Sequence, residues 1–244
     1  GDVVRAMEGR VADMARAVRS DRDMVGKMVD DLLDSTKQLL LLPFGSITAT
    51  FPKLVRDLCR YQGKQAELVI LGEQIELDKL ILEEIKDPLV HMLRNAVDHA
   101  VELPVVRERA GKPARARIVL EVRLQDGNQV QMLLSDDGAG IAHERVREAA
   151  VRQGLVTAEE AERLDRQALL PLVFRQELST SAAVTRVSGR GLGLAIAEER
   201  ARKLGGDVRV DSEEGQGTRF IITLPASRAS FRGVLCEAAG QQFL

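Results

Sequence analysis

The chain has 244 residues, enough for one domain of catalytic size and a smaller element. Its 35 Lys and Arg residues balance 37 Asp and Glu residues, and it has no Trp and one Tyr. We therefore exclude a nucleic-acid-binding protein, which needs a basic surface or stacking aromatic residues. Two cysteines are too few for a disulfide framework or a zinc site. Because no apolar run approaches about 20 residues, we expect a cytoplasmic protein without direct membrane insertion.

Residues 1–44 have the pattern of an antiparallel helical hairpin. Apolar residues recur every three or four positions, as in a coiled-coil seam, at Val4, Met7, Val11, Met14 and Val18 and again at Val25, Met28, Leu32 and Leu39. The polar break from Arg19 to Asp23 predicts the turn. Two helices alone leave such a seam exposed, so we expect a homodimer through residues 1–44, built as a four-helix bundle. Packing of the hairpin on its own chain is the alternative.

The rest of the chain alternates between helical and strand patterns. Helices are predicted where apolar residues recur with the helical period, at 51–61, 77–101, 142–173 and 192–204, with Pro88 starting or kinking the second. Strands are predicted at 68–71, 118–124, 130–134, 208–210 and 220–224, with an Asp126-Gly127 hairpin turn between the second and third. A loop is expected at 176–187. This order predicts an α+β sandwich with one layer of helices and one of strands, over residues 45–227.

The predicted helix around His91 has two chemically different faces. At about 100° per residue, one face carries Leu89, Met92, Leu93, Ala96 and Ala100, and the other carries His91, Asn95, Asp98 and His99. An ordinary amphipathic helix is the simpler interpretation. However, solvated faces usually carry Lys and Glu rather than side chains suited to metal binding and proton transfer.

Three glycine-containing segments could bind a nucleotide. Asp136-Asp137-Gly138-Ala139-Gly140 follows a strand, and a carboxylate there could accept a hydrogen bond from the amine of adenine. Ser188–Leu194 precedes a helix, where backbone N–H groups favour phosphate. Gly215-Gln216-Gly217-Thr218 precedes a strand. Each segment taken alone is equally well interpreted as an ordinary turn.

In order along the chain, HMLRNAVDHA, LLSDDGAGI, VSGRGLGL and EGQGTRFIITLP together resemble the ATP-binding domain shared by sensor histidine kinases, type II topoisomerases, Hsp90 and MutL. The similarity is greatest to CheA-type chemotaxis histidine kinases. The resemblance implies a Bergerat-type sandwich with a mixed sheet and helices on one face. It also implies that residues 1–44 form the dimerisation element and that 228–244 begin a truncated, CheW-like coupling domain.

The same resemblance implies roles for individual residues. Asn95 would hold Mg2+ on the phosphates of ATP, Asp136 would accept from the adenine amine, and His91 would be the base or polarising group near the γ-phosphate. The remaining nucleotide-binding positions it implies are Asp98, His99, Gly138, Gly140, Ile141, Ser179, Thr180, Ser188, Gly189, Arg190, Gly191, Leu192, Gly193 and Thr218. The segment from about Ala142 to Gly193 would form a flexible lid.

Residues 1–90 contain no histidine, so the predicted hairpin lacks a phosphoacceptor. The resemblance then implies that the γ-phosphoryl group goes to a histidine on a separate phosphotransfer domain. A response regulator, a CheW-like coupling protein and chemoreceptors are the further implied partners.

The lid segment from Arg175 to Ala182 departs from the family pattern, because the lysine usually found there is missing and Glu177 is acidic. We therefore expect weak ATP affinity. A dimeric, catalytically weak signalling scaffold is the alternative function. An ATPase that uses water as acceptor is a second, although such enzymes place a glutamate where His91 stands.

Overall fold

The computed structural model describes residues 14, 19–22, 24–29, 40–175, 193–226, 236–238 and 241–243. The chain divides into two compact units, Gly1–Leu41 and Leu42–Leu244. Among the described residues, no helix is both long enough and apolar enough to span a membrane.

The described residues of the first unit up to residue 29 are helical. They include Arg19–Arg22, where the sequence analysis expected a turn, so that expectation is wrong for these four residues. All four are exposed, and a helix accommodates polar residues on a solvent-facing side without a break. The other residues of the predicted hairpin lie outside the described part of the chain.

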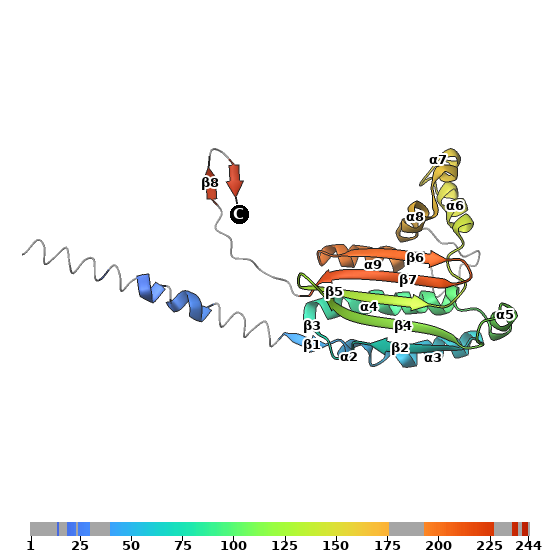
Figure 1. Ribbon diagram of the computed structural model, residues 1–244, viewed down its shortest axis with the longest axis horizontal. Helices are drawn as coiled ribbons and strands as arrows, with labels where there is room; N and C mark the ends of the chain where they lie inside the picture. The colour runs from blue at the N-terminus through green and yellow to red at the C-terminus, as the bar shows by residue number, and fades with distance from the viewer. Residues whose placement is uncertain are drawn as a thin grey trace, which may run out of the picture. The chain divides into compact units, whose positions relative to one another are not determined.

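The second unit is an α+β domain built on a five-stranded sheet (Figure 1). Its strands are β2 (Ala66–Leu71), β4 (Ala116–Gln125), β5 (Gln129–Asp136), β6 (Asp207–Glu213) and β7 (Gly217–Pro225). The strand order is β2-β4-β5-β7-β6; β2 runs parallel to β4, and the other neighbours are antiparallel. The sheet is therefore mixed, as predicted.

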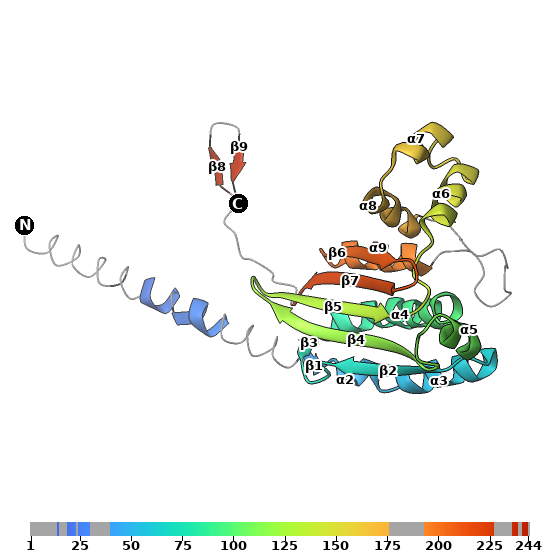
Figure 2. The same ribbon diagram turned by 45° about the vertical axis from the view of Figure 1, so that its right-hand side comes forward.

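Three helices cover one face of this sheet: α3 (Phe51–Gln62), α4 (Lys79–Asn95) and α9 (Gly193–Lys203) (Figure 2). The smaller elements are β1 (Leu41–Pro43), α2 (Gly45–Thr48), β3 (Glu76–Asp78), α5 (Pro104–Arg109), β8 (Cys236–Ala238) and β9 (Gln241–Phe243). Two-stranded sheets join β1 to β3 and β8 to β9.

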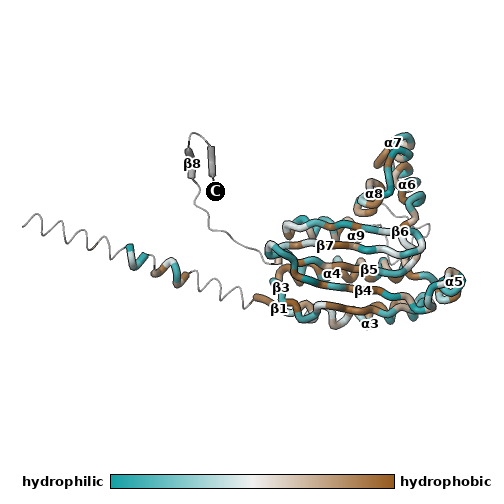
Figure 3. Tube along the Cα trace, in the orientation of Figure 1, coloured by the Kyte–Doolittle hydropathy of each residue, from teal (hydrophilic) through white to brown (hydrophobic). Residues whose placement is uncertain are grey.

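Alternation along the strands builds the core between the sheet and the helices. Ile118 and Leu120 of β4 and Met132 of β5 are buried, whereas Arg117 and Arg123 on the opposite face are exposed. From the helix side, Leu89 and Met92 of α4 are fully buried in the same core. The apolar run 68–71, predicted as a strand, forms most of β2 (Figure 3). Burial of one face thus fixes the register of every strand.

The predicted helix at 142–173 is wrong as a single element. The structure has α6 (His143–Arg152), α7 (Ala158–Arg163), α8 (Arg166–Leu169) and a 3-10 turn, η2 (Leu170–Phe174). Gly154 has a positive φ of 70°, and the side chains of Thr157 and Asp165 cap new helices at α7 and α8. Local caps and a left-handed glycine therefore divide a segment whose composition is helical throughout.

The helix predicted at 77–101 is confirmed, with corrections at its two ends and at Pro88. Asp78 starts α4 by accepting a hydrogen bond from the backbone N–H of Leu80. Pro88 does not start a helix, because it lies buried in the middle of α4. After Asn95 the chain continues as a five-residue π-helix, η1 (Ala96–Ala100), which closes with the Val101 N–H donating to the carbonyl of Ala96.

Candidate functional site

The last turns of α4 and the π-helix η1 present the predicted polar face. Met92, Leu93 and Ala96 are buried in the core, which turns His91 and Asn95 toward the other side of the helix. Both side chains are partly exposed, and neither makes a hydrogen bond or ion pair with any residue in the described part of the chain. The amide oxygen of Asn95 is therefore available to a ligand. A π-turn next to such a residue is typical of functional sites.

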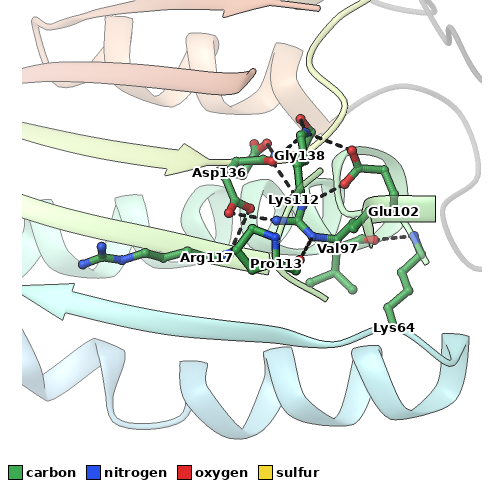
Figure 4. A network of polar contacts seen from close by, with 10 residues as sticks. Lys64, Val97, Glu102, Lys112, Pro113, Arg117, Asp136 and Gly138 are labelled. Atoms are coloured by element: carbon green, nitrogen blue, oxygen red, sulfur yellow. Dashed lines mark hydrogen bonds and ion pairs between the residues drawn. The ribbon is translucent and has the colours of Figure 1, made fainter. Parts of the chain in front are cut away.

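Asp98 and His99 lie on the π-helix itself, where neighbouring polar groups surround them. The Gln62 side chain at the end of α3 donates to the Asp98 carboxylate at 2.5 Å. Lys64 donates its Nζ to the backbone carbonyl of Val97 at 2.6 Å (Figure 4) and to that of Asp98 at 2.9 Å. These two side chains hold the π-turn from outside the helix. Neither residue could be predicted from the sequence, since no motif links residues 62 and 64 to residue 98.

The histidines on this face are held in their neutral forms. Burial lowers the pKa of His91, the charge of Arg94 lowers it further, and Asp98 opposes both. Burial also lowers the pKa of His99, with Asp98 opposing and Lys64 adding to the effect. His91 is therefore neutral at physiological pH and able to accept a proton.

Asp136 stands at the end of β5 with its side chain on the inner face of the sheet. It lies opposite Ile118 of β4 and Thr218 of β7, and Thr218 in turn lies opposite Ser212 of β6. The backbone N–H of Gly138 donates to its Oδ1 at 2.9 Å. Burial raises the pKa of Asp136 to about 6, although backbone hydrogen bonds at Gly138 and Thr218 lower it. Asp136, Thr218 and Ser212, on neighbouring strands, thus place a poorly solvated carboxylate beside two hydroxyl groups.

The hydroxyl of Ser212 connects the loop after β5 to the turn between β6 and β7. It accepts from the Ile141 N–H at 2.8 Å, donates to the Gly217 carbonyl at 2.9 Å and lies 3.0 Å from the Thr218 hydroxyl oxygen. The Gly215 N–H donates to the carbonyl of Ala139 at 2.8 Å. The turn between β6 and β7 is therefore joined to the loop after β5. Ser212 carries no motif and was missed from the sequence.

The loop after β5 also meets the end of the π-helix. The Ala139 N–H donates to the Ala100 carbonyl at 2.8 Å. A Cβ on Gly138 would stand 2.2 Å from that same carbonyl oxygen, and one on Gly140 would stand 2.2 Å from the Glu213 carbonyl oxygen. These glycines are needed for contact between backbone segments of the protein, a reason that the sequence analysis did not foresee. The structure thus brings three of the four predicted segments together.

The fourth predicted segment cannot be placed. Gly193 is the first residue of α9. The predicted nucleotide-binding residues just before it lie outside the described part of the chain: Ser179, Thr180, Ser188, Gly189, Arg190, Gly191 and Leu192. The altered lid residues after Arg175 and the expected loop at 176–187 lie outside them as well.

The side chains present fit a metal-bound nucleotide. Among the described residues, no group of three or more His, Cys, Asp or Glu side chains could hold a metal ion. A single amide oxygen such as that of Asn95 suits Mg2+ that takes its other ligands from phosphates and water. The partly buried Asp136 carboxylate receives only backbone donors from the described residues and so retains acceptor capacity for an amine.

Residues 84–228 match the family described as histidine kinase-, DNA gyrase B- and HSP90-like ATPases. The chain belongs to this family, whose domain binds ATP.

Over most of its length the chain is also CheA-like. It is 41% identical to the chemotaxis protein CheA of Halobacterium salinarum over 93% of this chain and 34% of that protein. It is 36% identical to CheA of Treponema pallidum over 99% of this chain and 29% of that protein. The chain thus spans about a third of the length of these relatives. The histidine kinase domain of the blue-light activated kinase of Erythrobacter litoralis aligns with a TM-score of 0.44 at 17% identity, over 76% of this chain and 66% of that one.

Replacing Gly138 by alanine tests the contact between the π-helix and the loop. We expect Gly138→Ala to lower the free energy of unfolding by more than about 2 kcal/mol, because the new Cβ would meet backbone rather than a movable side chain. Thermal denaturation measures the effect. Gly45→Ala is the matched control, since its Cβ would have ordinary contacts from 3.4 Å outward. Equal melting temperatures for both variants would contradict this account.

Asp136→Asn should stabilise the free protein at neutral pH. In the folded protein the pKa of the Asp136 carboxyl is raised from 3.8 to about 6. Protonation of this carboxyl therefore favours the folded state, and its ionisation above about pH 6 destabilises that state. At neutral pH we expect the melting temperature to rise by a few degrees, with the difference vanishing in acid, where the wild-type carboxyl is protonated as well. Asp57→Asn, an exposed change on α3, is the control. A lower melting temperature for Asp136→Asn at neutral pH would show that the buried charge is compensated.

Proposed function

We propose that this chain binds Mg-ATP and transfers the γ-phosphoryl group to a histidine on a separate phosphotransfer domain, in chemosensory two-component signalling. The observation that carries the proposal is the junction of Ala100 and Ala139, because it brings the helix of Asn95 against the loop that follows Asp136. Family membership and similarity to CheA over most of the chain support it.

Asp136 and Thr218 recognise the base in this proposal, and Asn95 holds the metal. The Asp136 carboxylate accepts a hydrogen bond from the exocyclic amine of adenine, and a base without that amine leaves the carboxylate unpaired. The Mg2+ ion neutralises charge on the phosphates. The predicted glycine-rich segment from Ser188 to Gly193 supplies backbone donors to the phosphates.

His91 acts on the acceptor side of the reaction. It stands one helical turn before Asn95 on the same face, so its ring would lie near the phosphates of a nucleotide whose metal Asn95 would hold. A neutral imidazole with no partner among the described residues accepts the proton that the attacking histidine loses. Positioning and charge neutralisation supply most of the remaining rate enhancement.

The acceptor histidine comes from outside residues 1–244. The three histidines of this chain are His91, His99 and His143. The first two lie on the proposed nucleotide helix, and Nε2 of His143 is buried without a hydrogen-bond partner among the described residues. Transfer therefore goes to a histidine phosphotransfer domain, and from there to a response regulator. A CheW-like coupling protein, chemoreceptors and a cytoplasmic location complete the proposal.

Trans-phosphorylation with an Asn95 variant tests the kinase proposal. The chain, Mg-ATP labelled at the γ-phosphate and a CheA-type phosphotransfer domain should yield acid-labile phosphohistidine on that domain. We expect Asn95→Ala to reduce the rate by at least about a hundredfold, because the metal ligand is lost. Lys86→Ala, an exposed change on the same helix, should have no effect.

The outcomes of this assay separate the alternatives. Nucleotide binding without transfer would favour a signalling scaffold and contradict the kinase. Free phosphate release without phosphohistidine would favour an ATPase that uses water. Label on His99 or His143 of the chain itself would contradict transfer to a separate domain.

The domain organisation is also part of the proposal. Residues 1–44 form a helical dimerisation element, 45–227 the kinase domain and 228–244 part of a coupling domain. Three predicted seam residues, Met14, Val25 and Met28, are 71%, 58% and 60% exposed in the single chain. A seam that stays this exposed is stabilised by a second copy of itself.

A charge placed in the seam tests the dimer. We expect wild-type chain to sediment as a dimer and Met28→Glu to sediment as a monomer, because the glutamate would be buried without a partner in the bundle. Lys27→Glu, the neighbouring exposed residue outside the seam, should leave the dimer intact. Analytical ultracentrifugation measures both masses. A dimeric Met28→Glu, or a monomeric wild type, would contradict this arrangement.

A further inference from the structure

A single charged side chain is fully buried in the described part of the chain: Arg107, on the short helix α5. A buried guanidinium destabilises a fold unless hydrogen bonds and opposite charges compensate it. The nucleotide motifs do not include this residue. Its burial beside the site therefore calls for a role.

Arg107 directs its guanidinium at the residue that follows Asp136. Its Nη2 donates to the Asp137 carboxylate at 2.9 Å, and its Nη1 donates to the Asp137 carbonyl at 3.1 Å and to the Glu102 carboxylate at 2.8 Å (Figure 4). Its Nε donates to the Pro113 carbonyl at 2.7 Å. The planar fork thus binds one residue of the loop through both side chain and backbone.

Lys112 completes the arrangement from the segment after α5. Its Nζ donates to the carbonyls of Asp137 and Gly138, at 2.9 and 2.6 Å, and to the Glu102 carboxylate at 3.0 Å. Burial alone would raise the pKa of Glu102, but hydrogen bonds from Lys112 and Arg107 lower it. The positive charges of Arg107 and Lys112 therefore neutralise the negative charges of Glu102 and Asp137. Both cations also contact the loop of the predicted nucleotide site.

The contacts of Arg107 and Lys112 distinguish two adjacent carboxylates, those of Asp136 and Asp137. Asp137 is occupied on both oxygens, because its Oδ2 pairs with Arg107 and its Oδ1 accepts from the Arg117 N–H at 2.9 Å. Asp136 has only backbone donors from the described residues. The network therefore decides which of the two carboxylates remains available to a base.

We propose that Arg107 and Lys112 are positioning residues of the nucleotide site: they neutralise Asp137 and Glu102 and fix the 137–138 backbone, so that the Asp136 carboxylate is oriented and ready for the adenine amine. This inference rests on the proposed function, since it concerns the same nucleotide.

If Arg107 and Lys112 act on Asp136 through their charges, their removal changes the pH dependence of nucleotide affinity, which a purely structural role would not do. The charged groups that act on Asp136 are Asp137 and Glu102, and both raise its pKa. Arg107 and Lys112 are the cations paired with them. Removing either cation takes away positive charge beside these carboxylates, so Asp136 takes up a proton at higher pH than in the wild type. Nucleotide affinity should then fail at a higher pH on acidification.

The test is the dissociation constant of ADP, measured calorimetrically from about pH 5 to about pH 9. Lys112→Met is the first variant, because the Lys112 side chain is 18% exposed and its loss should leave the fold intact. Arg107→Met is the second. We expect the acid midpoint of ADP affinity to move up by about one pH unit, so that affinity at about pH 5 falls about tenfold. Arg109→Met, an exposed arginine on the same helix, is the control.

A charge-balancing second change sharpens the result. Adding Asp137→Asn to Arg107→Met removes both members of the pair, so the acid midpoint should return toward the wild-type value. Folded variants that bind ADP with the wild-type affinity and midpoint would overturn the proposal, as would an affinity loss equal at every pH. Should Arg107→Met fail to fold, Lys112→Met decides alone. Wild-type protein that binds no ADP at all would instead contradict the proposed function.

Discussion

The hydrogen bond from Ala139 to the carbonyl of Ala100 is the contact on which the site depends. It holds the end of a helix against a loop that leaves the sheet, with Gly138 at a separation that admits no Cβ. Through it, side chains more than 40 positions apart in sequence belong to one surface. The turn between β6 and β7 is fastened to the same loop by Ser212 and Gly215. A loosening at this junction would separate the helix of Asn95, proposed to bind the metal, from the loop of Asp136, proposed to bind the base.

Two groups of polar side chains lie around this junction. Lys64 and Gln62 hold the π-turn that carries Asp98. Arg107 and Lys112 hold Asp137 and the following backbone. Asp136 is a partly buried carboxylate without an ion-pair partner among the described residues, and its raised pKa means that its ionisation at neutral pH destabilises the free protein. In the proposed function, this loss of stability keeps an acceptor available for the base.

Much of the domain could be predicted from periodicity. The alternation in β4 and β5 and the helical period of α4 follow from burial on one face, and the structure confirms them. The break of 142–173 into four short elements could not be predicted, because it depends on caps at Thr157 and Asp165 that compete with a helical composition. The helix at Arg19–Arg22 could not be predicted either, since a run of polar residues is equally typical of a turn and of the solvent-facing side of a helix.

The sequence by itself determined which residue types could serve a nucleotide, because the His91–His99 face, the Asp136 loop and the Thr218 turn each carry a local chemical pattern. Only the tertiary structure decided that they meet, and that Ser212, Arg107 and Lys112 support them. The physical reason is distance along the chain. A supporting residue needs only a donor in the right place, which many residue types and positions could provide, so it leaves no local pattern. Its role exists only once packing has brought the segments together.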